Sequence, residues 1–351
     1  MKDIAVILPV YNGADMLGSC LRSISLAGER ISEIIIIDDG STDRTLSEAE
    51  AYAANNPKIN VIHTENHGSY MARVTGIMAA TARYIAFIDV DDHYYNGALD
   101  MLADILEEYD ADIAFGGIEE TTDSGEPVFP KRAGSDRITE ISPEQIWPRI
   151  MKWKTQEFLL YIWHKIYKRE LFDGLPEIDG ICQGDDVILS CRAFMGAKKI
   201  VETTAPVYMY YTNPLGLTHK GFSDSDLDLI HVWDAVIDLV KSADHDFNMD
   251  PSLQYLARYN RWRTDFTLIM RLILTDDKEK NRKYAVELKK WRRGLKENWR
   301  SLITPHAMPK SREILIIALR FFYSPTKVLL RLVKRLQRAN IGELLHSGEK
   351  R

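Results

Sequence analysis

The sequence has 351 residues, more than one compact core usually holds, so we expect a main domain of roughly 200 residues or more and an appended unit. Hydrophobic residues make up 45% and charged residues 27% of the chain, a globular composition that excludes long disordered stretches. The formal net charge of -6 excludes a general nucleic-acid binder, whose binding domain would be basic.

The cysteines and the apolar segments indicate the compartment. Cys20, Cys182 and Cys191 lack zinc-finger or C-x-x-C spacing, so neither a disulfide framework nor a zinc site is expected and a reducing cytoplasm fits. The start of the chain lacks the apolar length and cleavage site of a signal peptide. No segment reaches the roughly 18 uninterrupted apolar residues of a spanning helix. We therefore expect a cytoplasmic protein that does not cross a membrane.

The first third alternates short apolar runs with helical stretches. The runs predict strands at Ile4–Leu8, Ile34–Ile37, Ile59–Ile62, Tyr84–Ile88 and Ile113–Phe115. Apolar residues at three- and four-residue spacing predict helices at Ala14–Leu26, Arg44–Ala54, Tyr70–Ala80 and Ala98–Glu108. This alternation is typical of an α/β fold with a mostly parallel sheet that is buried on both faces.

The remaining two thirds are less regular. Gly116–Arg137 is rich in turn residues and predicts a long loop or a small hairpin. Helices are expected at Pro143–Lys154 and Asp186–Met195, and short strands at Lys199–Val201 and Val207–Tyr211. Beyond Ser223 the chain is predicted to be helical almost to its end, with breaks near Asn248–Pro251, near Pro305–Pro309 and at Pro325.

Acidic residues follow two of the predicted strands, where ligands bind in open α/β sheets. Asp38 and Asp39 can accept hydrogen bonds from a base or ribose, while Gly40 permits a tight turn and Asp43 can cap the next helix. Turn and cap chemistry alone remains an alternative for this segment.

The second acidic segment is Asp89-Val90-Asp91-Asp92, directly after the fourth strand. In an extended segment the side chains of Asp89 and Asp91 lie on one side and can converge on one cation. Hard oxygen ligands suit Mg²⁺ or Mn²⁺, with substrate phosphate completing the shell. A solvated acidic turn is the alternative.

The third segment, Gly184-Asp185-Asp186, opens a predicted helix. A carboxylate there can act as general base for an acceptor hydroxyl within hydrogen-bond reach. The alternative is an ordinary helix N-terminus, where the macrodipole favours acids.

Together these segments resemble the inverting glycosyltransferases of family 2 with the GT-A fold, of the type that acts in bacterial surface polysaccharide synthesis. The resemblance covers roughly residues 1–220 and rests on six motifs that occur in the family's order. They are Val6-Ile7-Leu8-Pro9-Val10-Tyr11-Asn12, Glu33 through Asp43, Asn66-His67-Gly68 with Ala72-Arg73 and Gly76, Asp89-Val90-Asp91-Asp92, Trp163 through Arg169 before Leu171-Phe172, and Asp185-Asp186.

The resemblance implies a role for each matching residue. Asp186 is implied as the catalytic base, Asp91 as the direct metal ligand with Asp89 beside it, and Mn²⁺ or Mg²⁺ as the cation. The nucleotide-sugar-binding residues that it implies are Pro9, Val10, Tyr11, Asp38, Asp39, Arg73, Asp89 and Val90. On the acceptor side it implies Trp163, Lys165 and Asp185, and it makes His219 a candidate contact to metal or diphosphate when its loop closes. Core packing of Trp163 and a surface position of His219 are the alternatives.

Two positions depart from the family pattern. The family usually has Glu-Asp where this chain has Asp185-Asp186, which leaves open which acid is the base, and Val74 stands where the family usually has Asn. The resemblance implies that Arg73 and a cation hold the donor diphosphate while the acceptor oxygen attacks the anomeric carbon in a single, inverting displacement. Family analogy favours a UDP-sugar as donor and a saccharide or lipid-linked glycan as acceptor. We expect a donor-binding half at residues 1–115, an acceptor-binding half with the base at 116–220, and a helical C-terminal region at 221–351.

The tail is basic and apolar. Between His306 and Asn340, eight Lys or Arg stand against the single acid Glu313. Such a stretch can lie in an anionic membrane interface, here at the inner face of the cytoplasmic membrane. Alternatively, it packs its apolar face on the protein and leaves a solvated basic face.

Three other functions compete with this interpretation. A haloacid-dehalogenase-type phosphotransferase would carry its Asp-x-Asp on the first strand with Gly-Thr after it, whereas here the strand is the fourth and Asp92-His93 follows. A non-catalytic sugar-nucleotide-binding relative would not need Asp91 and Asp186. A dinucleotide dehydrogenase would show G-x-G-x-x-G after the first strand, which is absent.

Overall fold

The computed structural model describes residues 2–121, 137–142, 145–147, 149, 159–212, 221–243 and 251–348. The chain forms two compact units. The first comprises Met1–Ile150 and Glu157–Gly216, and the second comprises Met151–Gln156 and Leu217–Arg351.

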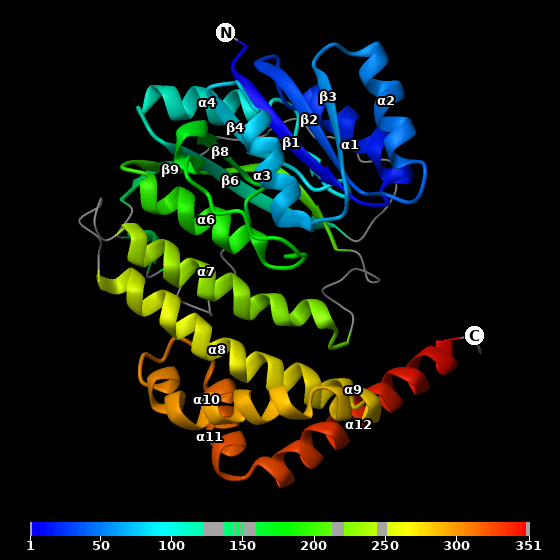
Figure 1. The fold of residues 1–351 in the computed structure, drawn as a ribbon, viewed down its shortest axis with the longest axis vertical. Coiled ribbons are helices and arrows are strands. Elements are labelled where there is room, and N and C mark those ends of the chain that lie inside the picture. Colours follow the sequence, from blue (N-terminus) through cyan, green and yellow to red (C-terminus); the bar gives the residue numbers. More distant parts are fainter. Residues whose placement is uncertain are drawn as a thin grey trace. The chain divides into compact units, whose positions relative to one another are not determined.

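A single sheet forms the centre of the first unit (Figure 1). Its strand order is β3-β2-β1-β4-β8-β6-β9-β5, and β7 pairs with β9. The strands are β1 (Ile4–Val10), β2 (Ile31–Asp39), β3 (Ile59–Thr64), β4 (Tyr84–Phe87), β5 (His93–Tyr94), β6 (Ile113–Thr121), β7 (Ile138–Ile141), β8 (Lys165–Lys168) and β9 (Ile200–Tyr211). Strands β1 to β4 are joined by parallel pairs, as are β6 and β9, whereas β8 runs antiparallel to β4 and β6. The α/β class with a mostly parallel sheet is confirmed.

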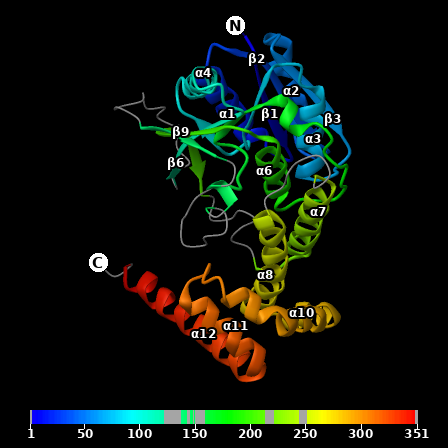
Figure 2. The ribbon, with the colours of Figure 1, turned by 90° about the vertical axis from the view of Figure 1, so that its left-hand side faces the viewer.

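Helices cover both faces of this sheet. They are α1 (Ala14–Ala27), α2 (Thr45–Asn55), α3 (Ser69–Ala79), α4 (Ala98–Glu108), α6 (Asp185–Gly196) and the 3₁₀ helix η1 (Arg169–Phe172). Helix α1 contacts α4, α3 contacts α6, and the two pairs lie on opposite faces (Figures 1 and 2). The strand order reverses direction at β1, with β2 and β3 on one side and β4 on the other. Ligands of doubly wound sheets bind at the carboxyl ends of the strands beside such a reversal.

Gly76 lets α3 approach the sheet closely. A Cβ atom at this position would lie 2.6 Å from Cγ2 of Ile7 and 2.7 Å from Cδ1 of Ile37, both buried strand side chains. A larger residue would therefore push α3 away from β1 and β2. Arg73 lies about one turn earlier on the same helix, so the close packing of α3 on the sheet also determines where Arg73 lies.

Several irregular segments differ from the prediction. The expected loop from Gly116 begins as strand, because β6 continues to Thr121, and residues 122–136 lie outside the described part. The two short strands predicted near residue 200 are one strand, β9, whose register against β6 shifts beside Pro206. Proline has no N–H for the ladder, and a bulge accommodates it without ending the strand. Strands β5, β7 and β8 were not predicted, and the expected helix at Pro143–Lys154 lies mostly outside the described residues.

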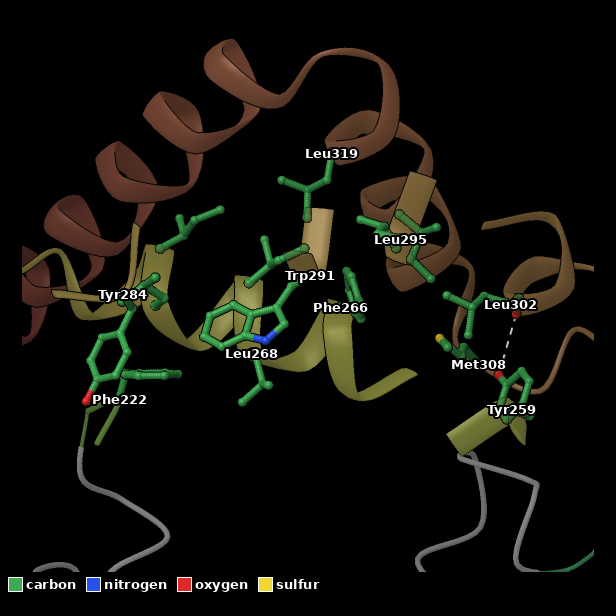
Figure 3. Close-up of a cluster of buried hydrophobic side chains, with 14 residues drawn as sticks. Phe222, Tyr259, Phe266, Leu268, Tyr284, Trp291, Leu295, Leu302, Met308 and Leu319 are labelled. Atoms are coloured by element: carbon green, nitrogen blue, oxygen red, sulfur yellow. Dashed lines mark hydrogen bonds between the residues drawn. The ribbon is translucent and has the colours of Figure 1, made fainter. Parts of the chain in front are cut away.

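The second unit is helical. Its elements are η3 (Asp224–Leu227), α7 (Asp228–Ala243), α8 (Pro251–Thr275), α9 (Lys278–Lys283), α10 (Ala285–Ile303), α11 (Lys310–Phe321) and α12 (Tyr323–Gly348). Figure 3 shows its core, in which Trp291 of α10 packs among side chains of α8 such as Phe266 and Leu268. The Tyr259 hydroxyl donates a hydrogen bond to the carbonyl of Leu302 and ties α8 to the end of α10.

The break near Pro305–Pro309 is confirmed, but the break at Pro325 is wrong. Helix α12 starts at Tyr323 and continues through Pro325, because a proline in the first turn lacks only an N–H that would have no intrahelical partner. The interruption lies at Phe322 instead. No helix among the described residues is both long and apolar enough to span a membrane.

Candidate active site

The first polar loop after β1 is tied to the loop after β2. Asn12 has a positive φ of 53°, and its Oδ1 accepts a hydrogen bond from the Thr42 N–H at 2.8 Å. Its own N–H donates to Oγ of Ser41 at 2.9 Å. Asn12 therefore fixes backbone geometry, and the preceding Tyr11 remains 52% exposed. Pro9 and Val10 end β1 at the same edge, and the side chains of Val10 and Val90 both pack on Gly13.

Asp38 and Asp39 have separate surroundings although they are adjacent. Asp38 is fully buried and its Oδ2 lies 2.7 Å from Nδ1 of His63 on β3. Asp39 accepts hydrogen bonds from the backbone N–H groups of His67 and Gly68, at 2.9 and 3.0 Å. Side chains of successive strand residues point to opposite faces, so only one of the two can face the crevice. Asp39 holds the loop that leads into α3, while Asp38 is directed toward β3.

Arg73 joins three predicted site residues. Its Nη2 lies 2.5 Å from Oδ1 of Asp89, and its Nη1 forms an ion pair with Asp185 and lies 3.4 Å from Oδ1 of Asp186. The arginine side chain is only 5% exposed. Helix α3, the segment after β4 and the start of α6, which lies about a hundred residues further along the chain, thus meet at one guanidinium.

The two neighbouring acids of α6 have different partners. Asp185 accepts a hydrogen bond from the Ser69 hydroxyl at 2.9 Å as well as the one from Arg73, so both of its oxygens are engaged. Oδ1 of Asp186 is buried and accepts no hydrogen bond from the described residues. Burial raises the pKa of Asp186 to about 6, against the opposing charge of Arg73. Of the two acids, Asp186 is the one with an oxygen that accepts no hydrogen bond from the described residues.

The segment Asp89–Asp92 is a turn and not an extended strand. The N–H of Asp92 donates to the carbonyl of Asp89 at 3.0 Å, so the expectation that Asp89 and Asp91 share one side of an extended segment is wrong. Tertiary contacts impose the turn: the carboxylate of Asp92 accepts hydrogen bonds from the Tyr208 hydroxyl and the Tyr211 N–H, both at 2.8 Å. Asp92 is therefore anchored to β9.

Asp91 is half-buried, and burial, followed by the nearby charge of Asp89, raises its pKa to about 6. Two carboxylates within mutual electrostatic reach form a fitting oxygen donor set for Mg²⁺ or Mn²⁺. Among the residues that the structure describes, no group of three His, Cys, Asp or Glu side chains could enclose a metal. A cation here would need further oxygens from water or a ligand, as Mg²⁺ usually has when it binds phosphates.

The aromatic segment before β8 forms a stack. The Trp163 ring is 1% exposed and lies between Tyr161 and Tyr208, with centroid distances of 5.1 and 4.4 Å. Tyr210 also stacks on it at 5.4 Å. Tyr161 is 43% exposed and is the accessible edge of the stack. Trp163 thus packs in the core and supports a tyrosine that reaches solvent.

Lys165 is completely buried. Its Nζ lies 2.6 Å from Nε2 of His164 and donates a hydrogen bond to the carbonyl of Tyr161. Burial lowers the pKa of Lys165, and the charge of Asp186 partly opposes this effect. The lysine is therefore within electrostatic reach of Asp186 from inside the fold.

Two residues of this site were missed from the sequence. The Tyr208 hydroxyl links Asp92 to the N–H of Asp89, and Ser69 engages Asp185. The alternation in Val207–Tyr211 is the only sequence signal for Tyr208. The candidate His219 lies outside the described residues.

Comparison with known proteins identifies relatives of this arrangement. The uncharacterized glycosyltransferase EpsJ of Bacillus subtilis (strain 168) is 29% identical over 217 residues, which are 61% of this chain and 62% of that protein. The uncharacterized glycosyltransferase YibD of Escherichia coli (strain K12) is 29% identical over 214 residues, or 59% of this chain and 61% of that protein. The chain thus spans about three fifths of the length of these relatives.

The solved structures add a likeness of fold. S. aureus TarS 1-349, in complex with UDP-GlcNAc, superposes with a TM-score of 0.61 at 17% identity, covering 96% of this chain and 92% of that chain. This likeness extends to the helical C-terminal region and confirms the expected GT-A fold with a helical extension. The family model for glycosyl transferase family 2 matches residues 5–185, just over half of the chain and nearly all the segments that meet at Arg73. The chain belongs to glycosyl transferase family 2.

Proposed function

We propose that this chain transfers a sugar from a nucleotide-sugar to an acceptor hydroxyl with inversion at the anomeric carbon. The observation that carries the proposal is the cluster at Arg73, in which one arginine holds the acid of the Asp-x-Asp segment and the pair Asp185-Asp186 together. Cation-binding acids and a base must lie near one anomeric carbon for a single displacement. Family membership and the glycosyltransferase relatives support the reaction class.

Asp186 is the proposed general base. A base works best when its pKa lies near the operating pH, and a carboxyl with a pKa of about 6 meets this condition better than an ordinary aspartate. It would take the proton of the acceptor hydroxyl while the oxygen attacks the face opposite the leaving nucleotide. Asp185, held by Ser69 and Arg73, is a positioning residue in this scheme.

Asp91, with help from Asp89, is the proposed ligand of Mn²⁺ or Mg²⁺. Such a cation neutralises the negative charge that develops on a leaving diphosphate. Asp89 is already paired with Arg73, which leaves Asp91 as the principal ligand. His219 remains a proposed further contact.

The donor would lie at the strand ends of residues 1–115. Pro9, Val10, Tyr11, Asp39 and Val90 border this region, with Asp38 and Arg73 supporting it from beneath. The complexes of TarS with UDP and with UDP-GlcNAc favour a uridine nucleotide. Residues 116–220, with Trp163 and Lys165 beneath Tyr161, would form the acceptor side, and the acceptor would be a saccharide or a lipid-linked glycan of cell-surface polysaccharide synthesis.

Release of nucleotide from a panel of UDP-sugars tests the reaction without knowledge of the acceptor, because water can replace the hydroxyl. Asp186→Asn should slow turnover about a hundred- to ten-thousand-fold while nucleoside diphosphate binding stays normal. Asp173→Asn, a change at a 65% exposed carboxylate of the same unit, is the matched control. Normal turnover in Asp186→Asn would remove the assignment, and a normal Asp186→Asn beside an inactive Asp185→Asn would move the base one residue upstream.

Calorimetry tests the cation. We expect a nucleoside diphosphate to bind more tightly with Mn²⁺ than without it, and Asp91→Asn to abolish the difference. Asp104→Asn, at a 73% exposed side chain, should keep it. Equal affinity with and without the cation would contradict the proposal.

A further inference from the structure

Helices α10 and α11 of the second unit line an open basic pocket of about 340 Å³. Five of its lining residues are cations and the other two are leucines, so no acid is among the described residues that line it. The cations are Lys289, Arg292, Arg293, Lys296 and Arg320.

Little negative charge compensates these five cations. Arg293 has one acid nearby, Glu297, at 3.9 Å between two exposed side chains, a distance at which a surface ion pair contributes little. Arg292 lies over the Tyr323 ring, 3.8 Å from its centroid. The Nε atom of Arg320 is buried and has no hydrogen-bond partner within the described part of the chain. A buried donor without a partner costs free energy, and an anionic oxygen is the kind of acceptor that would recover it.

Helix α12 turns its basic side inward. Arg331 and Arg335 pair with the carboxylate of Asp276, at 2.9 and 2.6 Å. Arg331 and Lys334 also donate to the carbonyls of Ile273 and Leu274, in the last turn of α8. Cations are favoured there because the last carbonyls of a helix lack partners and carry its negative dipole end.

The apolar side of α12 consequently faces solvent. Val328, Leu329, Leu332, Val333 and Leu336 are between 43% and 67% exposed. The sequence left open whether the tail packs by its apolar side and solvates its basic one. Helix α12 has the reverse arrangement, whereas α11 buries Ile316 and Leu319 in the core of the unit.

Helix α11 extends this apolar surface to the pocket. Ile314, Ile317 and Phe321 recur at helical spacing and are 64%, 37% and 53% exposed, and Phe322 is 64% exposed. Phe321 and Phe322 directly follow Arg320 of the pocket. Contiguous exposed apolar side chains next to concentrated charge are uncommon on a monomer and mark an interaction surface.

We propose that the second unit binds an anionic phospholipid membrane, with a lipid phosphate in the basic pocket and the exposed apolar side chains of α11 and α12 in the outer acyl region. A bilayer interface presents phosphates immediately beside hydrocarbon, which matches cations beside phenylalanine and leucine. This activity belongs to the second unit alone and does not depend on sugar transfer.

Two other occupants fit less well. A two-fold contact with a second copy pairs a surface patch with the same patch of the other copy. The cations of the two pockets would then lie close together and repel each other. Nucleic acid would use the cations but would leave the row of valine and leucine on α12 exposed.

Co-sedimentation with phosphatidylglycerol-containing vesicles, compared with pure phosphatidylcholine vesicles, tests the proposal on the full chain. We expect binding only to the anionic vesicles, and weaker binding at high salt. Lys289→Gln/Arg293→Gln/Lys296→Gln should lower the affinity at least tenfold, since each cation near an anionic surface adds roughly a further several-fold. The matched control is Lys2→Gln/Arg22→Gln/Lys198→Gln, which removes the same charge from exposed positions of the first unit and should bind almost normally.

A double variant tests the apolar surface. Leu329→Ser/Leu332→Ser should also weaken vesicle binding, with an unchanged thermal melt and unchanged nucleotide release from a UDP-sugar, so that failure here is distinguishable from failure of the transferase. Equal affinity for both vesicle types, no binding at low salt, or full binding by the pocket variant would overturn the proposal. The proposal would also be overturned if the protein bound glycerol phosphate in solution but did not bind the vesicles, since the pocket would then hold a soluble phosphate.

Discussion

The two units arrange charge in opposite ways. In the first unit one arginine, Arg73, lies among three acids, Asp89, Asp185 and Asp186, and is 5% exposed. In the second unit one acid, Asp276, lies between two arginines, Arg331 and Arg335, and is 21% exposed. We call each of these clusters, one central charge with its oppositely charged partners, a hub; both hubs join segments that are distant in sequence.

Burial determines what each hub does. A buried charge that loses its partners cannot be solvated, so the first hub constrains both folding and the position of the proposed catalytic groups. Water can replace a partner at the second hub, so it holds α12 weakly and leaves the apolar side of the helix available. Four changes test this contrast.

Removing the arginine of the buried hub should have the largest effect. Arg73→Met leaves three carboxylates without their common cation, and we expect the free energy of unfolding of the first unit to fall by about 3–5 kcal/mol in urea denaturation. Arg30→Met is the control: Arg30 also pairs with Asp3 and Glu107, but it is 14% exposed and lies outside the site. A loss at Arg73 no greater than that at Arg30 would show that burial does not determine the cost of removing such an arginine.

Removing the charge of a buried acid in the second unit should raise the free energy of unfolding instead of lowering it. Asp265 is 7% exposed, and burial raises its pKa to about 6 against the charge of Arg261. Because the folded pKa exceeds the unfolded value of about 3.9, its contribution to stability is present below pH 4 and is lost as the pH rises through 6. Asp265→Asn should therefore stabilise the protein by about 1–2 kcal/mol at pH 8 and by little at pH 4. Asp238→Asn, at a 74% exposed side chain, should show no such pH dependence in parallel melts.

Removing the acid of the exposed hub should cost less. We expect Asp276→Asn to lower the free energy of unfolding by about 0.5–1 kcal/mol. The hydrogen bond from Arg335 lowers the pKa of Asp276, so this contribution is present above about pH 4 and is lost as the pH falls through the folded pKa. Denaturation of wild type and variant between pH 3 and 7 measures it. A difference that grows toward low pH would contradict the assignment.

Truncating the exposed apolar side of α12 should have the smallest effect on folding. Leu332→Ala, at a 52% exposed residue, should change the free energy of unfolding by less than about 0.5 kcal/mol. Leu272→Ala, at a 1% exposed residue of the same unit, should cost about 2–5 kcal/mol. Similar losses for both would mean that the α12 surface is part of the folded core and not an interface.

The sequence predicted the regular elements well. A parallel strand that is buried on both faces is apolar throughout, and a helix that is buried on one side repeats its apolar residues every three to four positions. The four predicted helices between Ala14 and Glu108 are confirmed to within a residue or so at each end. The prediction failed at β5, at β9 and at Pro325, where the conformation depends on a neighbouring strand or on position within a helix.

Residue types and their order in the chain were sufficient to place the acids of the site and to name the family. Their distances were decided only in three dimensions, because Asp89 and Asp185 lie 16 and 112 residues beyond Arg73 and meet it through the packing of α3 and α6. Tertiary contacts also bent Asp89–Asp92 into a turn and directed Asp38 toward His63. They left Asp186 with an oxygen that accepts no hydrogen bond from the described residues, whereas both oxygens of Asp185 accept one. For the tail, composition determined that basic and apolar residues lie together, but only the last carbonyls of α8 and the carboxylate of Asp276 determined that the basic side of α12 faces the protein.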